Sequence, residues 1–300
     1  MRAQIKFLAD GRRLHLHDGP IDLIVEAFGA PREVSAAYRA ATERFVTVLD
    51  ELCRELPLLR QAARGSTAPA TGVIARRMRA AVAPYSERTF ITPMAAVAGA
   101  VAEEILGSMT SAASLSRAYV NNGGDIALHL ARGERFVIGM VERPDRPSLF
   151  GKVELHSTQP VRGIATSGWR GRSFSLGIAD AVTVLADHAA MADAAATIIA
   201  NAVDLPNHPG IERVPAREIA PDNDLGERLV TRAVGDLTPR EIDQALHSGV
   251  VVARQLIRRG LIGAAAFGLQ CQSRVEPQAA QMLTLIGHPG AESVGSVMHV

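Results

Sequence analysis

Residues 181–203 are AVTVLADHAAMADAAATIIANAV, a β-branched apolar run followed at once by an alanine-rich segment. The first six residues predict a strand, and His188–Val203 predicts a helix whose residues are nearly all apolar or small. Asp193 is the exception. Positions four apart lie on one face of a helix, so the Asp193 carboxylate and the Thr197 hydroxyl can converge on one hard cation. The alternative is that Asp193 is solvated or pairs with a nearby arginine.

Two glycine-bearing segments lie upstream of this helix. In Asn121–Asp125, NNGGD, consecutive glycines let the backbone approach a ligand or adopt positive φ, although a plain hairpin turn explains the same residues. Gly163–Gly168, GIATSG, predicts a small-residue turn whose amides and hydroxyls can cradle phosphate oxygens. Arg170 and Arg172 follow it and favour an anionic ligand. A self-capped loop with two surface arginines is the alternative.

The rest of the chain alternates strands and helices irregularly. Ala3–Leu8 and Arg13–His17 predict two paired strands around an Asp-Gly turn, and Arg32–Leu56 predicts a long amphipathic helix. Met94–Leu106 predicts a helix with a proline in its first turn, and a capping box at Thr238 predicts another. The irregular order predicts an α+β fold with mixed or antiparallel sheets and helices packed on one face.

Composition limits the classes of partner. The 300 residues are 47% hydrophobic, enough for one large core or two modest ones. The net charge is +1, with 32 basic against 31 acidic residues, which disfavours nucleic acid or a membrane surface as the main partner. The apolar helical stretches are too short to span a bilayer, and the N-terminus lacks a signal-peptide pattern, so we expect a cytoplasmic protein. Its alanine-rich helices are compatible with a homodimer.

Cysteine and histidine give weaker indications. Cys53 and Cys271 lie far apart in sequence without neighbouring metal-ligand spacing, and we expect both to be buried thiols in a reducing compartment. His15 and His17 lie two apart on a predicted strand and face the same side, which suits a metal, although paired surface histidines are common. His208 lies in a loop between two prolines, and its role is open.

Taken in order, the Gly-Gly-Asp turn, the Ala-Thr-Ser-Gly segment and the helix with Asp193 and Thr197 resemble the ApbE flavin transferases, most strongly over residues 92–203. The resemblance implies an ApbE-like, T-fold-like unit over residues 1–300, built from two intertwined α/β subdomains. It implies binding of a small-molecule nucleotide, FAD, with Mg²⁺ held by Asp193 and Thr197. The residues implied to line the cofactor site are Ala98, Gly99, Gly123, Gly124, Asp125, Thr166, Ser167 and Gly168.

Two departures from the family pattern bear on activity. Ala98 stands where the family has a lysine, and Gly171–Gly177 replaces a His-Ile-Ile-Asp-Pro-like stretch. Asp180 and His188 are displaced along the chain and receive no catalytic role. The match is closer to an uncharacterised bacterial and archaeal branch of ApbE-like proteins. FMN transfer depends on positioning and charge neutralisation, so these losses leave three functions open. They are FMN transfer from FAD, non-catalytic nucleotide binding or assembly, and an enzyme acting on another heterocyclic, C1-carrier type cofactor in the same cleft.

Overall fold

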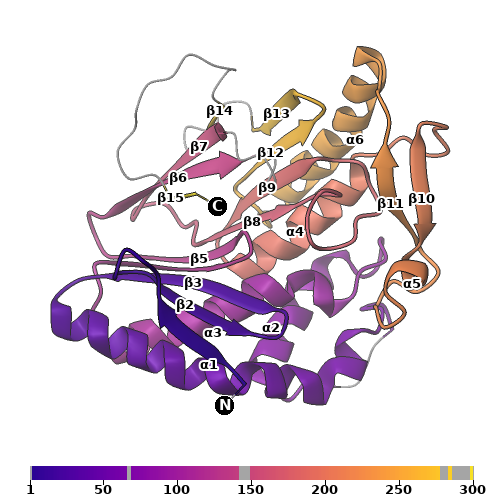
Figure 1. Ribbon diagram of the computed structural model, residues 1–300. Coiled ribbons are helices and arrows are strands. Elements are labelled where there is room, and N and C mark those ends of the chain that lie inside the picture. Colours follow the sequence, from indigo (N-terminus) through magenta and orange to yellow (C-terminus); the bar gives the residue numbers. More distant parts are fainter. Residues whose placement is uncertain (1, 66–68, 142–148, 278–282, 286–297, 300) are drawn as a thin grey trace. The chain divides into compact units, whose positions relative to one another are not determined.

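The computed structural model describes residues 2–65, 69–141, 149–277, 283–285 and 298–299. The chain divides into two compact units, each built from segments that are not contiguous in sequence. We call them the N-terminal unit and the C-terminal unit. The N-terminal unit comprises Met1–Phe136, Leu155–Ala165 and Ala186–Ala194, and the C-terminal unit comprises Val137–Glu154, Thr166–Leu185 and Ala195–Val300. Helices and mainly antiparallel strands occur in both, which confirms the predicted α+β class (Figure 1).

The N-terminal unit contains an antiparallel sheet. Its strand order is β1 (Gln4–Phe7), β2 (Leu14–Asp18), β3 (Ile21–Phe28), β4 (Arg117–Asn122), β5 (Asp125–Leu130) and the first residues of β8 (Gly163–Ser167). The predicted Asp-Gly turn joins β1 to β2, with Gly11 at φ 67°. Leu14, Leu16, Leu23 and Val25 alternate with more exposed residues and are buried. This period of two gives the sheet one apolar face.

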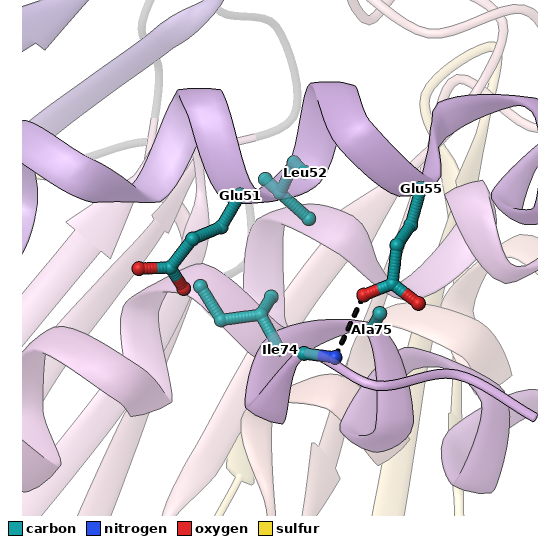
Figure 2. A pocket seen from close by; sticks show the side chains of 6 residues that line it. Glu51, Leu52, Glu55, Ile74 and Ala75 are labelled. Atoms are coloured by element: carbon teal, nitrogen blue, oxygen red, sulfur yellow. Dashed lines mark hydrogen bonds between the residues drawn. The ribbon is translucent and has the colours of Figure 1, made fainter.

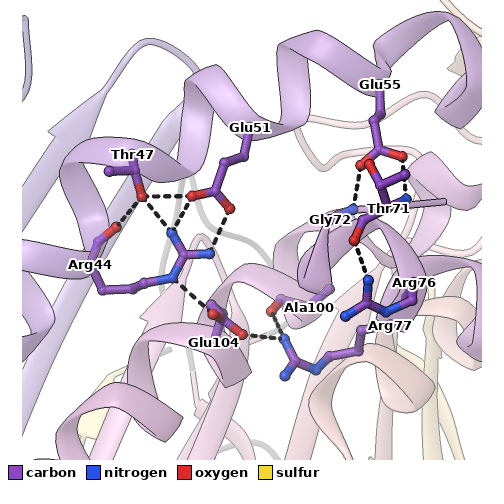
Figure 3. A network of polar contacts seen from close by, with 10 residues as sticks. All are labelled: Arg44, Thr47, Glu51, Glu55, Thr71, Gly72, Arg76, Arg77, Ala100 and Glu104. Atoms are coloured by element: carbon purple, nitrogen blue, oxygen red, sulfur yellow. Dashed lines mark hydrogen bonds and ion pairs between the residues drawn. The ribbon is translucent and has the colours of Figure 1, made fainter.

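Helices cover that apolar face. They are α1 (Pro31–Leu59), α2 (Val73–Val82) and α3 (Val97–Ala112), and α1 and α3 contact the strands directly. Pro93–Ala96 forms a 3₁₀ turn, so α3 begins three residues later than the predicted Met94. A glutamate network joins the three helices, as Figure 3 shows. Glu104 of α3 accepts from Arg44 Nε of α1 at 2.8 Å and pairs with Arg77 of α2 at 3.0 Å.

The C-terminal unit contains three groups of strands. One is an antiparallel ladder of β9 (Ala181–Ala186), β12 (Ala264–Leu269) and β13 (Gln272–Glu276). The second is the pair β10 (Ile211–Pro215) and β11 (Leu229–Val234), followed and preceded by the short helix α5 (Ala216–Ile219). The third is the small sheet of β14 (Leu283–Leu285), β7 (Leu149–His156), β6 (Arg135–Val141) and β15 (Met298–His299), with β15 parallel to β6.

Two long helices accompany these strands. Helix α4 (Ala189–Ala202) begins in the N-terminal unit and continues into the C-terminal unit. Helix α6 (Pro239–Arg258) starts at the predicted capping box, in which Thr238 and Glu241 bond reciprocally. Gly260 follows at φ 67°, the conformation that ends helices. None of the described helices is long and apolar enough to cross a membrane.

The prediction of buried cysteines is wrong, because both thiols are exposed. Cys53 follows the buried Leu52 on α1 and therefore lies off the apolar stripe that faces the sheet. Cys271 lies in the tight turn between β12 and β13 at φ 65°. His15 Nε2 contacts Asp22 Oδ1 at 2.6 Å, but the described residues contain no cluster of three side chains able to hold a metal ion.

Candidate functional site

Asp193 caps a helix other than its own. The 3₁₀ turn before α3 ends at Ala96, which has no side chain to accept from the free amides of the first α-helical turn. Asp193 of α4 supplies the acceptor, since the backbone N–H of Gly99 donates to its Oδ2 at 3.0 Å. The Ala98 amide also donates to the Asp193 carboxylate. The position and orientation of this carboxylate are therefore set by the start of α3.

The reverse contact also exists, so α3 and α4 cap one another. Glu103 lies four residues after Gly99, on the same face of α3. Its Oε1 accepts from the backbone N–H of Ala190, in the first turn of α4, at 3.3 Å. Arg77 Nε holds the other oxygen of Glu103 at 2.9 Å. Two long-range carboxylate caps thus fix the two helix starts against each other.

Gly99 is required by this close packing. A Cβ atom added there would lie 2.3 Å from the carbonyl oxygen of Ala189 and 2.7 Å from the nitrogen of Ala190. Gly163 approaches the same helix start, because a Cβ there would lie 2.2 Å from the carbonyl carbon of His188. The structure therefore gives both glycines a packing role at the start of α4.

The Gly-Gly turn lies between paired strands. Asn122 faces Asp125 across the hairpin, and Gly123 and Gly124 have φ of 65° and 113°, which disfavours other residues. The hairpin is tied to α3, because Asn122 Nδ2 donates to the carbonyl of Ala98 at 3.2 Å. The turn thus brings Asp125, itself buried, to the start of α3 where Asp193 lies.

The two carboxylates repel each other in their charged forms. Burial raises the pKa of Asp193 well above its ordinary value, and the neighbouring Asp125 carboxylate raises it further. The amides of Gly99 and Ala98 act in the opposite direction, because they favour the charged form. Two desolvated carboxylates with an opposing charge effect form an arrangement that a cation would stabilise.

The Thr-Ser-Gly segment differs from its prediction. Gly163–Ser167 is strand β8 rather than a turn, with Gly163 and Ile164 paired to β5. The apolar Ile164 and Ala165 are fully buried, which favours pairing over an open loop. The Thr166 hydroxyl lies 2.9 Å from that of Thr183. The turn begins at Gly168, where a Cβ would lie 2.4 Å from the carbonyl oxygen of Asp180.

The remaining candidates lie in the C-terminal unit. Thr197 is half-buried and follows Asp193 by one turn of α4. Arg170 pairs with the buried Asp180 at 2.6 Å, so its charge is already compensated, while Arg172 is exposed. His208 pairs with Glu241 at 3.0 Å and buttresses the start of α6.

A small hollow lies elsewhere in the N-terminal unit, between α1 and α2 (Figure 2). Glu55 occupies one side of it and accepts from the backbone amides of Thr71 and Gly72 at 2.8 and 2.7 Å. Burial alone would raise the pKa of Glu55, but these two amides hold it below its ordinary value. Because this carboxylate caps the start of α2, the hollow is a structural feature rather than a candidate ligand site.

With this geometry described, comparisons with known proteins place the chain. A family model described as AbpE bacteria matches residues 5–276. The chain belongs to this family. Curated relatives include UPF0280 proteins of archaea. That of Methanopyrus kandleri is 40% identical over 129 residues, covering 43% of this chain and 48% of the relative. That of Methanosphaerula palustris is 35% identical over 177 residues, covering 57% and 71%.

The matches cover only part of some relatives. The UPF0280 protein of Methanococcoides burtonii is 41% identical over 123 residues, covering 41% of this chain and 50% of the relative. This family member thus spans about half the length of the M. kandleri and M. burtonii proteins. Among solved structures, the apo form of Pseudomonas stutzeri flavinyl transferase ApbE matches with 10% identity and a TM-score of 0.35, over 89% of this chain and 91% of that one.

Sequence reasoning missed Glu103. Its spacing of four from Gly99 places both on one face of a helix, a signal that identifies Glu103 once the packing of that face is known. The contacts of Glu103 with Ala190 and Arg77 join residues 87 and 26 positions away in the chain, which no local pattern encodes.

We expect Glu103→Ala to cost about 1–2 kcal/mol of folding stability, because it removes a helix cap and a largely buried partner of Arg77. Native-state hydrogen exchange should show faster exchange at the Ala190 amide. Glu104→Ala is the matched control, since Glu104 also pairs with Arg77 but caps no amide of α4. Equal exchange at Ala190 in both variants would contradict the reciprocal cap.

Proposed function

We propose that the chain binds FAD, or a related nucleotide, as its magnesium complex. The carboxylates of Asp193 and Asp125 would hold the ion on the diphosphate, with the Thr197 hydroxyl one helical turn further along α4. The observation that carries the proposal is the carboxylate pair at the start of α3, in which burial and the charge of Asp125 both raise the pKa of Asp193.

The donor set fits magnesium. Mg²⁺ prefers oxygen ligands and is ordinarily bound by one or two carboxylates together with substrate phosphates, so a cluster of three protein ligands is not needed. Gly99 engages only Oδ2 of Asp193, and a carboxylate has lone pairs on both oxygens. The ion would neutralise the diphosphate and relieve the repulsion between the two aspartates.

The chain's own residues would supply orientation. Ala98 and Gly99 hold Asp193 through their amides, and Asn122 holds the carbonyl of Ala98. The turn at Gly168 would offer backbone groups to the nucleotide. Transfer of FMN is less well supported than binding, because Ala98 replaces the lysine that the family resemblance leads one to expect, and an arginine cannot act as a base at neutral pH.

Purified protein tests the proposal directly. We expect its melting temperature to rise with FAD and Mg²⁺ together, and to rise less with FAD alone, because a ligand that binds the native state stabilises it by mass action. Mg²⁺ with riboflavin, which lacks phosphate, is the control ligand. Absence of any shift with FAD and Mg²⁺ at millimolar concentrations would reject the proposal.

A separate assay distinguishes binding from transfer. The protein is incubated with FAD, Mg²⁺ and a threonine-bearing acceptor peptide, and covalent flavin is detected by mass spectrometry. Binding without covalent flavin supports a non-catalytic nucleotide-binding protein, whereas flavinylated peptide supports a transferase.

A further inference from the structure

Trp169 lies directly after Gly168 and is the chain's one tryptophan. Its side chain is half-buried, so part of the indole remains open to solvent. The backbone is held by a hydrogen bond from Trp169 N to the carbonyl of Ala179 at 3.0 Å. The indole Nε1–H donates to Asp180 Oδ1 at 3.1 Å. Ring and backbone are therefore both fixed.

The guanidinium of Arg170 stacks on this ring. Its Cζ lies 4.3 Å from the ring centroid of Trp169, and its Nε donates to the same Asp180 oxygen at 2.6 Å. Asp180 is 7% exposed, so these hydrogen bonds are made in surroundings that strengthen them. One buried carboxylate thus orients an indole and a guanidinium as a single stack.

The same carboxylate also braces a strained turn. Asp180 Oδ2 accepts from the backbone N–H of Gln270 at 2.6 Å, and Gln270 has φ of 44°. The Gln270 side chain bonds to Leu237 N and to the carbonyl of Gly235, at 3.0 and 2.7 Å. A non-glycine residue keeps such a backbone only where its surroundings over-determine it, so the support beneath the stack is rigid.

We propose that Trp169 stacks against a planar heteroaromatic ring of the bound nucleotide. This inference rests on the proposed function and adds a binding residue to it. Aromatic side chains give stacking that every base or flavin ring can use, and a fixed indole loses little conformational entropy on binding. The stacked Arg170 and the exposed Arg172 make the surroundings favourable for a ligand that also carries phosphate.

The test measures binding of FAD with Mg²⁺ by isothermal titration calorimetry. Trp169→Leu should weaken binding about tenfold or more. Trp169→Phe retains an aromatic ring and should stay within about threefold of the parent. Phe174→Leu, a change at another half-buried aromatic residue of the same loop, is the matched control and should leave binding unchanged. Melting temperatures of the variants without ligand establish that they are folded.

The single tryptophan provides a second readout that does not depend on any variant folding. ADP absorbs negligibly at wavelengths that excite only tryptophan, so fluorescence quenching by ADP with Mg²⁺ would report contact with the adenine ring. Comparing ADP with FMN in the Trp169→Leu variant identifies which ring is stacked, because only the affinity for the ligand carrying that ring should fall.

The outcomes separate the two proposals. If the parent binds FAD and Trp169→Leu binds it, ADP and FMN equally well, the stacking role is overturned while the proposed function stands. If the parent binds neither FAD nor ADP with Mg²⁺, the proposed function fails and the stacking role fails with it.

Discussion

Gly99→Ala should destabilise the protein by about 3 kcal/mol, at the upper end of the ordinary cost of overpacking. The added methyl group would lie 2.3 Å from the Ala189 carbonyl oxygen and 2.5 Å from its carbon, and these contacts are to backbone. Helix α3 must then move away from α4, which also lengthens the hydrogen bond from Gly99 to Asp193. Urea unfolding measures the loss.

Gly107→Ala on the same helix is the matched control. A Cβ atom at Gly107 meets nothing within 4 Å, and the residue is exposed. Alanine there should stabilise the protein by about 0.5–1 kcal/mol through its higher helix propensity. If the two variants had similar stability, the close packing of α3 on α4 would be wrong.

Asp180→Ala should be the second large loss, about 2–3 kcal/mol. The carboxylate accepts from Arg170, Trp169 and the Gln270 amide, and removing it leaves all three without this acceptor. The value lies below that for a fully buried ion pair because the Arg170 side chain is 27% exposed. Asp180→Asn keeps an acceptor of similar shape and should cost less.

A surface ion pair of similar geometry provides the comparison for Asp180. Arg274 and Asp243 approach to 2.7 Å, but Asp243 is 67% exposed. Because exposed pairs contribute little, Asp243→Ala should leave the urea midpoint nearly unchanged. Equal losses in Asp180→Ala and Asp243→Ala would show that the Asp180 contacts are not a buried network.

Local patterns predicted much of the fold. The Asp-Gly and Gly-Gly hairpins follow from turn chemistry, and α4, α6 and the strand Ala181–Ala186 follow from periodicity and capping. Strand β7 and the pair β10–β11 were not predicted, because short strands with mixed polarity have little local signal. Gly163–Ser167 was predicted as a turn because its residues are small, while pairing with β5 decides its conformation.

The candidate site was predicted less completely than the fold. Asp193 could be identified because one carboxylate interrupts an otherwise apolar helix. Its partner could not, because the amide of Gly99 lies 94 residues away in the sequence. Asp125 was predicted only as a turn residue, and its electrostatic coupling to Asp193 depends on how the hairpin and two helices pack. Long-range packing of this kind leaves no trace in residue spacing.

The most direct test of magnesium-assisted nucleotide binding compares Asp193→Asn with the parent. Asparagine keeps an oxygen that can cap α3 but removes the charge that would hold the ion, and it also relieves the repulsion from Asp125. Without ligand, this variant should therefore be as stable as the parent or more stable. Asp187→Asn, at an exposed residue just before α4, is the matched control.

The decisive measurement is the affinity for FAD by isothermal titration calorimetry, with and without Mg²⁺, in the parent and both variants. The account predicts that Mg²⁺ tightens FAD binding at least tenfold in the parent and in Asp187→Asn, and has no such effect in Asp193→Asn. An equal effect of Mg²⁺ in all three proteins, or no effect in the parent, would contradict it.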